Sequence, residues 1–149
     1  YHTPADPVAD VARFDAIESG AGPAVRLYRP NDVDDAPIRP ALYRDGRVGL
    51  SEVLPYLTAF GATVLDERPY ELDLADATHR YIYDFGLRFD RDLDDADFDR
   101  VAEAFIAGWE GRKEAGVFDR LVVAGLDWQH VTIIRALGKY LCQAGFTYY

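Results

Sequence analysis

Four stretches of the chain alternate apolar with polar residues or are rich in β-branched and aromatic side chains. This composition and a period of two predict strands, because successive side chains of a strand point to opposite faces of a sheet. The predicted strands cover residues 24–28, 39–44, 63–72 and 78–89. Pro69 has no backbone N–H and is therefore expected either to place the third strand at a sheet edge or to break it. In the fourth strand, Tyr81, Tyr83 and Phe85 share one face.

Other stretches repeat apolar residues at the spacing of an amphipathic helix. The predicted helices cover about residues 7–18, 51–60, 94–109 and 127–145, with a short apolar segment at 118–123. Ser51, Asp94 and Asp127 are the expected N-terminal caps, since their side chains accept hydrogen bonds from the first free N–H groups. Gly61 and Gly145 are expected to end the second and the last helix. Asp45-Gly46, a dipeptide that suits hairpins, is expected to form a turn.

The predicted order is strand, strand, helix, strand, strand, helix, helix. This order indicates an α+β fold close to the ferredoxin-like βαββαβ sheet with helices on one face, followed by extra C-terminal helices. The chain has 149 residues, which suffices for one core of ordinary size. We expect a lead-in helix or linker at 1–22, an α+β domain at 23–115 and a helical extension at 116–149.

The composition favours a packed domain: 49% of the residues are hydrophobic and 13% are aromatic. The formal net charge of -10 argues against binding to nucleic acid or to an anionic membrane surface, both of which require cationic side chains. Neither a membrane-spanning run nor a signal peptide is recognisable, so we expect a cytoplasmic protein. The chain contains no Met, not even at its start, and is therefore expected to be a fragment of a longer protein.

Motifs for catalysis or cofactor binding are not recognisable in the sequence. No G-x-G-x-x-G or P-loop pattern is present, so NAD binding in the usual manner is not expected. Residues 84–86 (Asp-Phe-Gly) match the metal-binding triplet of kinases, but no other kinase motif accompanies them. The three histidines are far apart, and Cys142 lies in a helical pattern where we expect a buried, inert thiol. We therefore expect no catalytic, cofactor-binding or metal-binding residue.

One group of polar residues is concentrated on the third and fourth predicted strands. Its members are Asp66, Glu67, Arg68, Tyr70, Tyr81, Tyr83 and Asp84. Because an unpaired buried charge is costly, Arg68 is expected to pair with one of these acids. Three interpretations remain open: a structural polar network, an interface within a larger assembly, or a contact with a small ligand.

Several longer motifs resemble, in their sequence and in their order along the chain, segments of one protein family. Residues 49–57 (GLSEVLPYL), 61–70 (GATVLDERPY) and 81–87 (YIYDFGL) are similar to segments of the large bacterial NAD-specific glutamate dehydrogenases. The similarity continues through residues 101–105, 109–111, 118–122, 124–126, 128–129, 135–141 and 143–146. It covers nearly the whole chain, and residues 31–37 and 73–77 are the least similar parts.

The resemblance implies that the chain corresponds to the last ACT-like domain and to the start of the helical region that precedes the catalytic domain. The parent enzymes convert L-glutamate and NAD to 2-oxoglutarate, ammonia and NADH. Their glutamate-binding lysines and NAD-binding glycines match no position here, so the segment itself is expected to hold no cofactor. The resemblance thus implies a non-catalytic regulatory or assembly domain. Such a domain is expected to contact other domains and subunits of the parent enzyme and to self-associate, and it is a candidate for binding an amino-acid effector. The alternatives are a free-standing ACT-like amino-acid sensor and a small independent enzyme.

Overall fold

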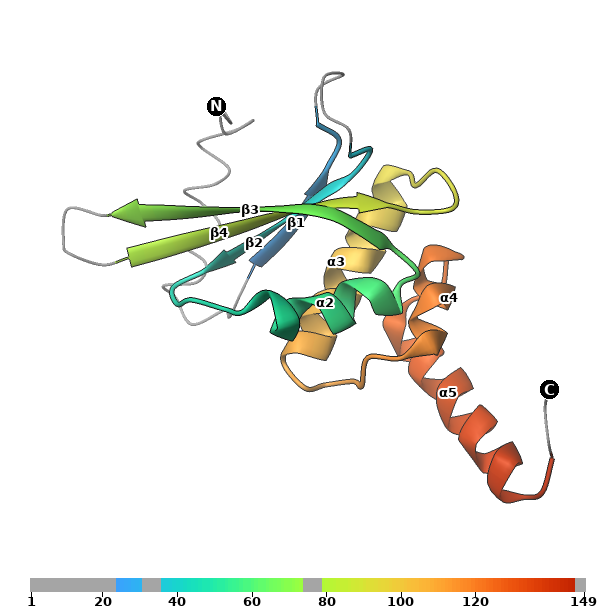
Figure 1. Ribbon diagram of the computed structural model, residues 1–149. Coiled ribbons are helices and arrows are strands. Elements are labelled where there is room, and N and C mark those ends of the chain that lie inside the picture. Colours follow the sequence, from blue (N-terminus) through green and yellow to red (C-terminus); the bar gives the residue numbers. More distant parts are fainter. Residues whose placement is uncertain (1–23, 31–35, 74–78, 147–149) are drawn as a thin grey trace. The chain divides into compact units, whose positions relative to one another are not determined.

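The computed structural model describes residues 24–30, 36–73 and 79–146. The elements are β1 (Ala24–Tyr28), β2 (Arg39–Arg44), α2 (Leu50–Ala59), β3 (Thr63–Asp73), β4 (His79–Arg88), α3 (Asp95–Trp109), the short 3-10 helix η1 (Val117–Asp119), α4 (Arg120–Val123) and α5 (Trp128–Gln143) (Figure 1). The expected order of strands and helices is confirmed. The helix predicted at 7–18 lies outside the described residues.

The four strands form one sheet in the order β1-β2-β4-β3. β2 pairs antiparallel with β1 and with β4, in a register that places Ala41 opposite both Arg26 and Asp84. β3 is an edge strand, as Pro69 predicted. In a βαββαβ unit the last strand lies beside the first; here β1, which precedes the unit, lies beside β2. The sheet and the helices confirm the α+β, ACT-like class.

The chain divides into two compact units. The sheet unit consists of the residues up to Val53 and of residues 64–88. The helical unit consists of residues 54–63 and of the residues from Phe89 onward. In the sheet unit, strand alternation separates an apolar from a polar face. The apolar face holds the buried side chains of Leu27, Leu42, Tyr83, Phe85 and Leu87. Asp84 lies between two of these positions on β4 and belongs to the other face.

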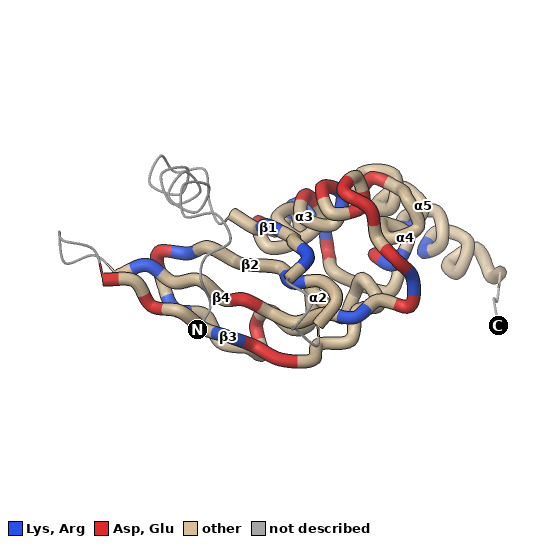
Figure 2. The backbone as a smooth tube through the Cα atoms, turned by 90° about the horizontal axis from the view of Figure 1, so that it is seen from above, with Lys and Arg blue, Asp and Glu red and all other residues tan. Residues whose placement is uncertain are grey.

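The helical unit is built around the buried stripe of α3, whose apolar members are Phe98, Val101, Ala104, Phe105 and Ala107. Tyr56 packs its ring against Phe105 at a centroid distance of 5.8 Å and against Trp109 at 5.5 Å. Lys113 Nζ lies 2.8 Å from the carboxylate of Asp119, and both side chains are buried. The unit therefore combines an aromatic core with a buried ion pair. α5 carries Arg135 and Lys139 but no acidic residue (Figure 2).

Three local expectations are corrected by the structure. α2 begins at Leu50, so Ser51 lies inside the helix; instead, Glu52 Oε1 accepts from the Gly49 N–H at 3.2 Å. Asp127 occupies the N-cap position of α5, but its side chain makes no cap hydrogen bond. Asp45-Gly46 forms a bend that leads into α2 rather than a hairpin turn.

Cys142 is exposed, not buried. The expectation failed because the apolar pattern of α5 was taken as evidence for a covered face. Val131 is the one residue of that helix that is buried among the described residues. An apolar stripe on a helix shows which side can be covered, and burial also requires a neighbouring element.

Asp94 caps α3 as predicted. Its side chain accepts from the Asp97 N–H at 2.8 Å, and the Asp97 carboxylate accepts from the Asp94 N–H at 2.9 Å. Arg91 and Arg100 also donate to Asp97, whose side chain is only 3% exposed. Burial opposes ionisation of Asp97, but these hydrogen bonds hold its pKa below the ordinary value.

We expect this carboxylate to make the stability of the helical unit depend on pH. A folded-state pKa below the unfolded one contributes stability above the unfolded pKa, and that stability is lost as the pH falls through the folded value. Asp97→Asn should lower the free energy of unfolding by about 1–3 kcal/mol at neutral pH. Its difference from the wild type should shrink below about pH 4. Urea unfolding across this range measures both, and a constant difference would contradict the assignment. Asp99→Asn, an exposed change on the same helix, is the control.

Candidate functional site

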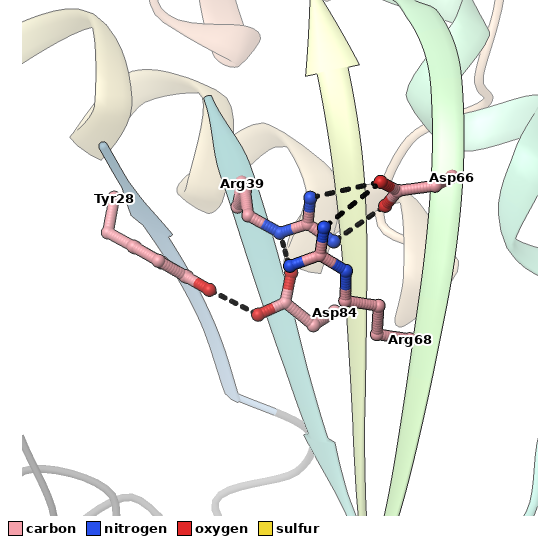
Figure 3. A network of polar contacts seen from close by, with 5 residues as sticks. All are labelled: Tyr28, Arg39, Asp66, Arg68 and Asp84. Carbon is pink, nitrogen blue, oxygen red and sulfur yellow. Dashed lines mark hydrogen bonds and ion pairs between the residues drawn. The ribbon is translucent and has the colours of Figure 1, made fainter. Parts of the chain in front are cut away.

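The polar face of the sheet carries a network that joins all four strands (Figure 3). Asp84 on β4 accepts hydrogen bonds from the hydroxyl of Tyr28 on β1 and from Arg39 Nε on β2, the latter at 2.5 Å. The guanidinium of Arg39 also donates to Asp66 on β3, through Nη2 at 2.6 Å and Nη1 at 3.3 Å. Arg68 Nη2 lies 3.4 Å from Asp66 Oδ2. We call these five residues the sheet network.

The centre of the sheet network is buried and its rim is open. The side chains of Arg39 and Asp84 are 1% and 2% exposed, whereas those of Asp66 and Arg68 are 38% and 41% exposed. Burying two charges is tolerated when each is paired and its remaining donors or acceptors are satisfied. With two guanidinium groups and two carboxylates, the network is formally neutral. Its residues can hold each other in place without a bound ion.

The pKa values follow from this packing. Burial opposes the charged form of Arg39, but the hydrogen bonds that it donates to Asp66 and Asp84 outweigh this effect and raise its pKa. Burial raises the pKa of Tyr28, and the hydrogen bond to Asp84 raises it further. At neutral pH the network therefore contains a permanent cation and a neutral phenol that donates. Neither group is available as a proton acceptor.

Strand register explains why these residues meet. Tyr28 lies directly opposite Arg39, and Ala41, two positions after Arg39 on the same face, lies opposite Asp84. Tyr28 and Arg39 were not among the expected site residues. Both residues lie among apolar neighbours, so the sequence pattern predicts ordinary strands and does not single them out. Only the pairing of β2 with β4 brings Arg39 close to Asp84.

The other residues that were predicted for the site lie on both faces of the sheet. Tyr70 follows Asp66 and Arg68 at alternate positions of β3; burial and then the charge of Asp84 raise the pKa of its phenol. Glu67 is half-buried and alternates to the other face. The pairing expected for Arg68 is present, and its partner is Asp66.

Tyr81 and Tyr83 form a second group on the other face of β4. Their rings stack at a centroid distance of 6.3 Å, and the guanidinium of Arg47 lies 5.7 Å from the centre of the Tyr81 ring. Tyr83 is buried and its hydroxyl accepts from the Val48 N–H at 3.0 Å. Tyr81 donates to Glu71 at 3.4 Å. This group fixes the segment that leads into α2.

Glycine at position 86 is required by the close approach of the sheet network. A Cβ there would lie 2.9 Å from the Ala36 Cβ and from Asp66 Oδ1, and 3.0 Å from Arg39 Nη1. We expect Gly86→Ala to lower the free energy of unfolding by about 1–3 kcal/mol, because the buried guanidinium cannot move away without losing an acceptor. Gly46→Ala, which meets nothing within 4 Å, is the matched control in urea unfolding. Equal stability of the two variants would contradict the close packing.

One group of possible metal ligands occurs among the described residues: Glu71, Asp73 and His79, whose ligand atoms lie within 4.8 Å of one another. His79 Nδ1 is 2.8 Å from the Asp73 carboxylate and 3.4 Å from that of Glu71. All three side chains are exposed. The contacts of the imidazole with Asp73 and Glu71 account for this geometry.

The charged residues of the sheet network thus act chiefly on one another. In the sheet network both carboxylates are engaged by guanidinium groups, which favours a structural role over acid–base chemistry.

Among the helices that the structure describes, none has the length and apolarity needed to cross a membrane.

Comparison with known proteins gives two family matches in sequence order. Residues 22–101 match the ACT3 domain of glutamate dehydrogenase, and residues 114–149 match helical motif 3 of glutamate dehydrogenase. The sheet network lies within the first match.

Curated relatives agree with these matches. The chain is similar to the NAD-specific glutamate dehydrogenases of Mycobacterium tuberculosis (35% identity over 98% of this chain), Halomonas elongata (33% over 93%) and Pseudomonas aeruginosa (31% over 91%). It spans 9% of the length of each. The chain therefore belongs to the glutamate dehydrogenase family, as an ACT3 domain followed by helical motif 3.

Proposed function

We propose that this chain is a non-catalytic regulatory or assembly segment of a cytoplasmic NAD-specific glutamate dehydrogenase. The observation that carries the proposal is the ordered match to an ACT3 domain and a helical motif, within 9% of the length of each relative. In this proposal NAD binds elsewhere in the enzyme, and the parent protein oxidises L-glutamate to 2-oxoglutarate and ammonia.

The geometry supports a role as a rigid platform. The sheet network links residues of all four strands through hydrogen bonds and paired charges, and a paired buried network resists rearrangement because each broken contact leaves a desolvated group. A platform of this kind can transmit a binding event or hold subunits together. We propose that assembly includes self-association through the sheet edges formed by β1 and β3.

The regulatory form of the proposal adds an amino-acid effector. A free-standing amino-acid sensor is the alternative, and the helical motif that follows the ACT3 domain is the feature that argues against it.

A thermal-shift titration of the purified 149-residue chain tests this proposal. The panel consists of the twenty amino acids, 2-oxoglutarate and NAD. A ligand that binds only the folded state at 100 times its Kd stabilises it by about 2.7 kcal/mol, so millimolar binders are detectable. A rise in Tm with one amino acid supports regulation, and no rise with any compound supports assembly. A rise in Tm with NAD would contradict the non-catalytic role.

A further inference from the structure

A groove of about 700 Å³ lies between η1 and α5 in the helical unit. It is lined by Phe118, Ile134, Leu137, Gly138, Leu141 and Cys142, and its surface is almost entirely apolar. Next to it on α5, Ile133 is 57% exposed and Tyr140 is 66% exposed. Contiguous apolar surface of this kind on a soluble protein marks an interaction site.

The shape of the groove suits a helix. Ile133, Leu137 and Tyr140 follow one another at the i, i+4, i+7 spacing with which one helix presents a seam to another. At Gly138 a Cβ would lie 3.2 Å from the Phe118 ring, so the missing side chain lets that ring pack close to the backbone of α5. Leu137 and Leu141, one turn apart on α5, then present side chains between which a ridge of a second helix can fit.

The charges near the groove specify the partner further. Residues 128–149 contain no acidic residue, although the whole chain has a net charge of -10. Lys139 borders the groove and is 61% exposed, and Arg135 is 23% exposed; both lie within ion-pair distance of Glu114, Lys139 Nζ at 3.7 Å, so two cations share one carboxylate. A cationic, apolar surface on an acidic chain is complementary to an amphipathic helix with acidic flanks. Pairing of this surface with the same surface of a second copy is disfavoured, because the two α5 helices would bring like charges together.

We propose that this groove binds an amphipathic helix with acidic flanking residues, supplied by another segment of the same dehydrogenase polypeptide. The inference rests on the proposed function, in which the chain is one part of a longer protein. The length of the relatives supplies candidates for the partner, since the chain spans 9% of each. The groove would then be an internal contact that fixes the helical motif to the rest of the enzyme.

Cys142 provides a native reporter for the test. It lines the groove, it is exposed, and it is the only cysteine of the 149 residues. The experiment measures the rate at which N-ethylmaleimide labels Cys142 in the 149-residue chain and in the full-length dehydrogenase, followed on the Cys142 peptide by mass spectrometry. A docked helix should slow labelling in the full-length protein by at least about tenfold, because the thiol then reacts only after local opening.

Two substitutions on α5 separate docking at the groove from unrelated shielding. Leu137→Asp places a charge in the groove and should return labelling in the full-length protein to the rate of the 149-residue chain. Ala136→Asp places the same charge on an exposed neighbouring position that does not line the groove, and labelling should stay slow. Leu137 is 57% exposed, so the 149-residue variant should keep its Tm within a few degrees of the wild type.

The outcomes distinguish the possible occupants. Equal labelling rates in the short chain and the full-length protein would overturn the proposal. Protection in the short chain that grows with its concentration would overturn it in favour of a second copy. Protection that Leu137→Asp does not relieve would show that Cys142 is shielded by a contact elsewhere. Stabilisation of the short chain by NAD would instead contradict the proposed function and leave the labelling result intact.

Discussion

Replacing Asp84 by alanine is expected to lower the free energy of unfolding by about 3–5 kcal/mol, because it leaves the guanidinium of Arg39 buried with one partner removed. Arg39 is 1% exposed and cannot regain hydration without opening the sheet. The hydroxyl of Tyr28 loses its acceptor in the same change. For a protein of this size the melting temperature should fall by roughly 10 °C.

Urea unfolding followed by circular dichroism measures this loss. Asp45→Ala, an exposed change just after β2, is the matched control and should alter stability by less than about 0.5 kcal/mol. If Asp84→Ala cost no more than the control, the ion pair would be accessible to water and the sheet network would not hold the strands together.

The second large effect is expected in the helical unit. Phe105→Ala should lower the free energy of unfolding by about 3–5 kcal/mol, since truncating a buried aromatic ring leaves a cavity as well as losing apolar burial. Phe105 is 3% exposed, stacks on Trp109 at a centroid distance of 5.9 Å and contacts the edge of Tyr56. Val117→Ala, at a position that is 70% exposed, should be nearly neutral.

Differential scanning calorimetry of both variants checks the assignment. A small effect of Phe105→Ala would mean that the cavity collapses easily and that the aromatic core is loosely packed. A large effect of Val117→Ala would mean that this side chain is covered in solution.

Most of the secondary structure was predictable from the sequence because the strands and the longer helices carry strong local patterns. Pro69 predicted an edge strand and Asp94 predicted the start of α3, and both predictions rest on backbone hydrogen bonding that a single residue decides. Ser51 was wrong as a cap because Gly49 and Glu52 already satisfy that end of α2. Helix boundaries shift by one or two residues when two arrangements satisfy the same N–H groups.

The polar site was only partly predictable. Asp66, Arg68 and Asp84 stand out in the sequence as charges on strands, but the cation that joins them, Arg39, lies in a different segment. Its role depends on the pairing of β2 with β4, which is a contact between residues far apart in the sequence. The prediction that Cys142 is buried failed for a related reason. Burial of a helix face depends on neighbouring elements, which the pattern of the helix itself does not reveal.

The most direct test of the proposed non-catalytic role is kcat of the full-length dehydrogenase that we propose carries this segment, with Glu67→Gln and Tyr70→Phe introduced together. These substitutions remove the one carboxylate, and one of the three phenols, of the predicted polar group that lie outside the sheet network. We predict a kcat within about threefold of the wild type at saturating L-glutamate and NAD, because loss of a general acid or base costs about 10²–10⁴-fold. A fall in kcat of a hundredfold or more, with the melting temperature unchanged, would contradict the account and place chemistry in this segment.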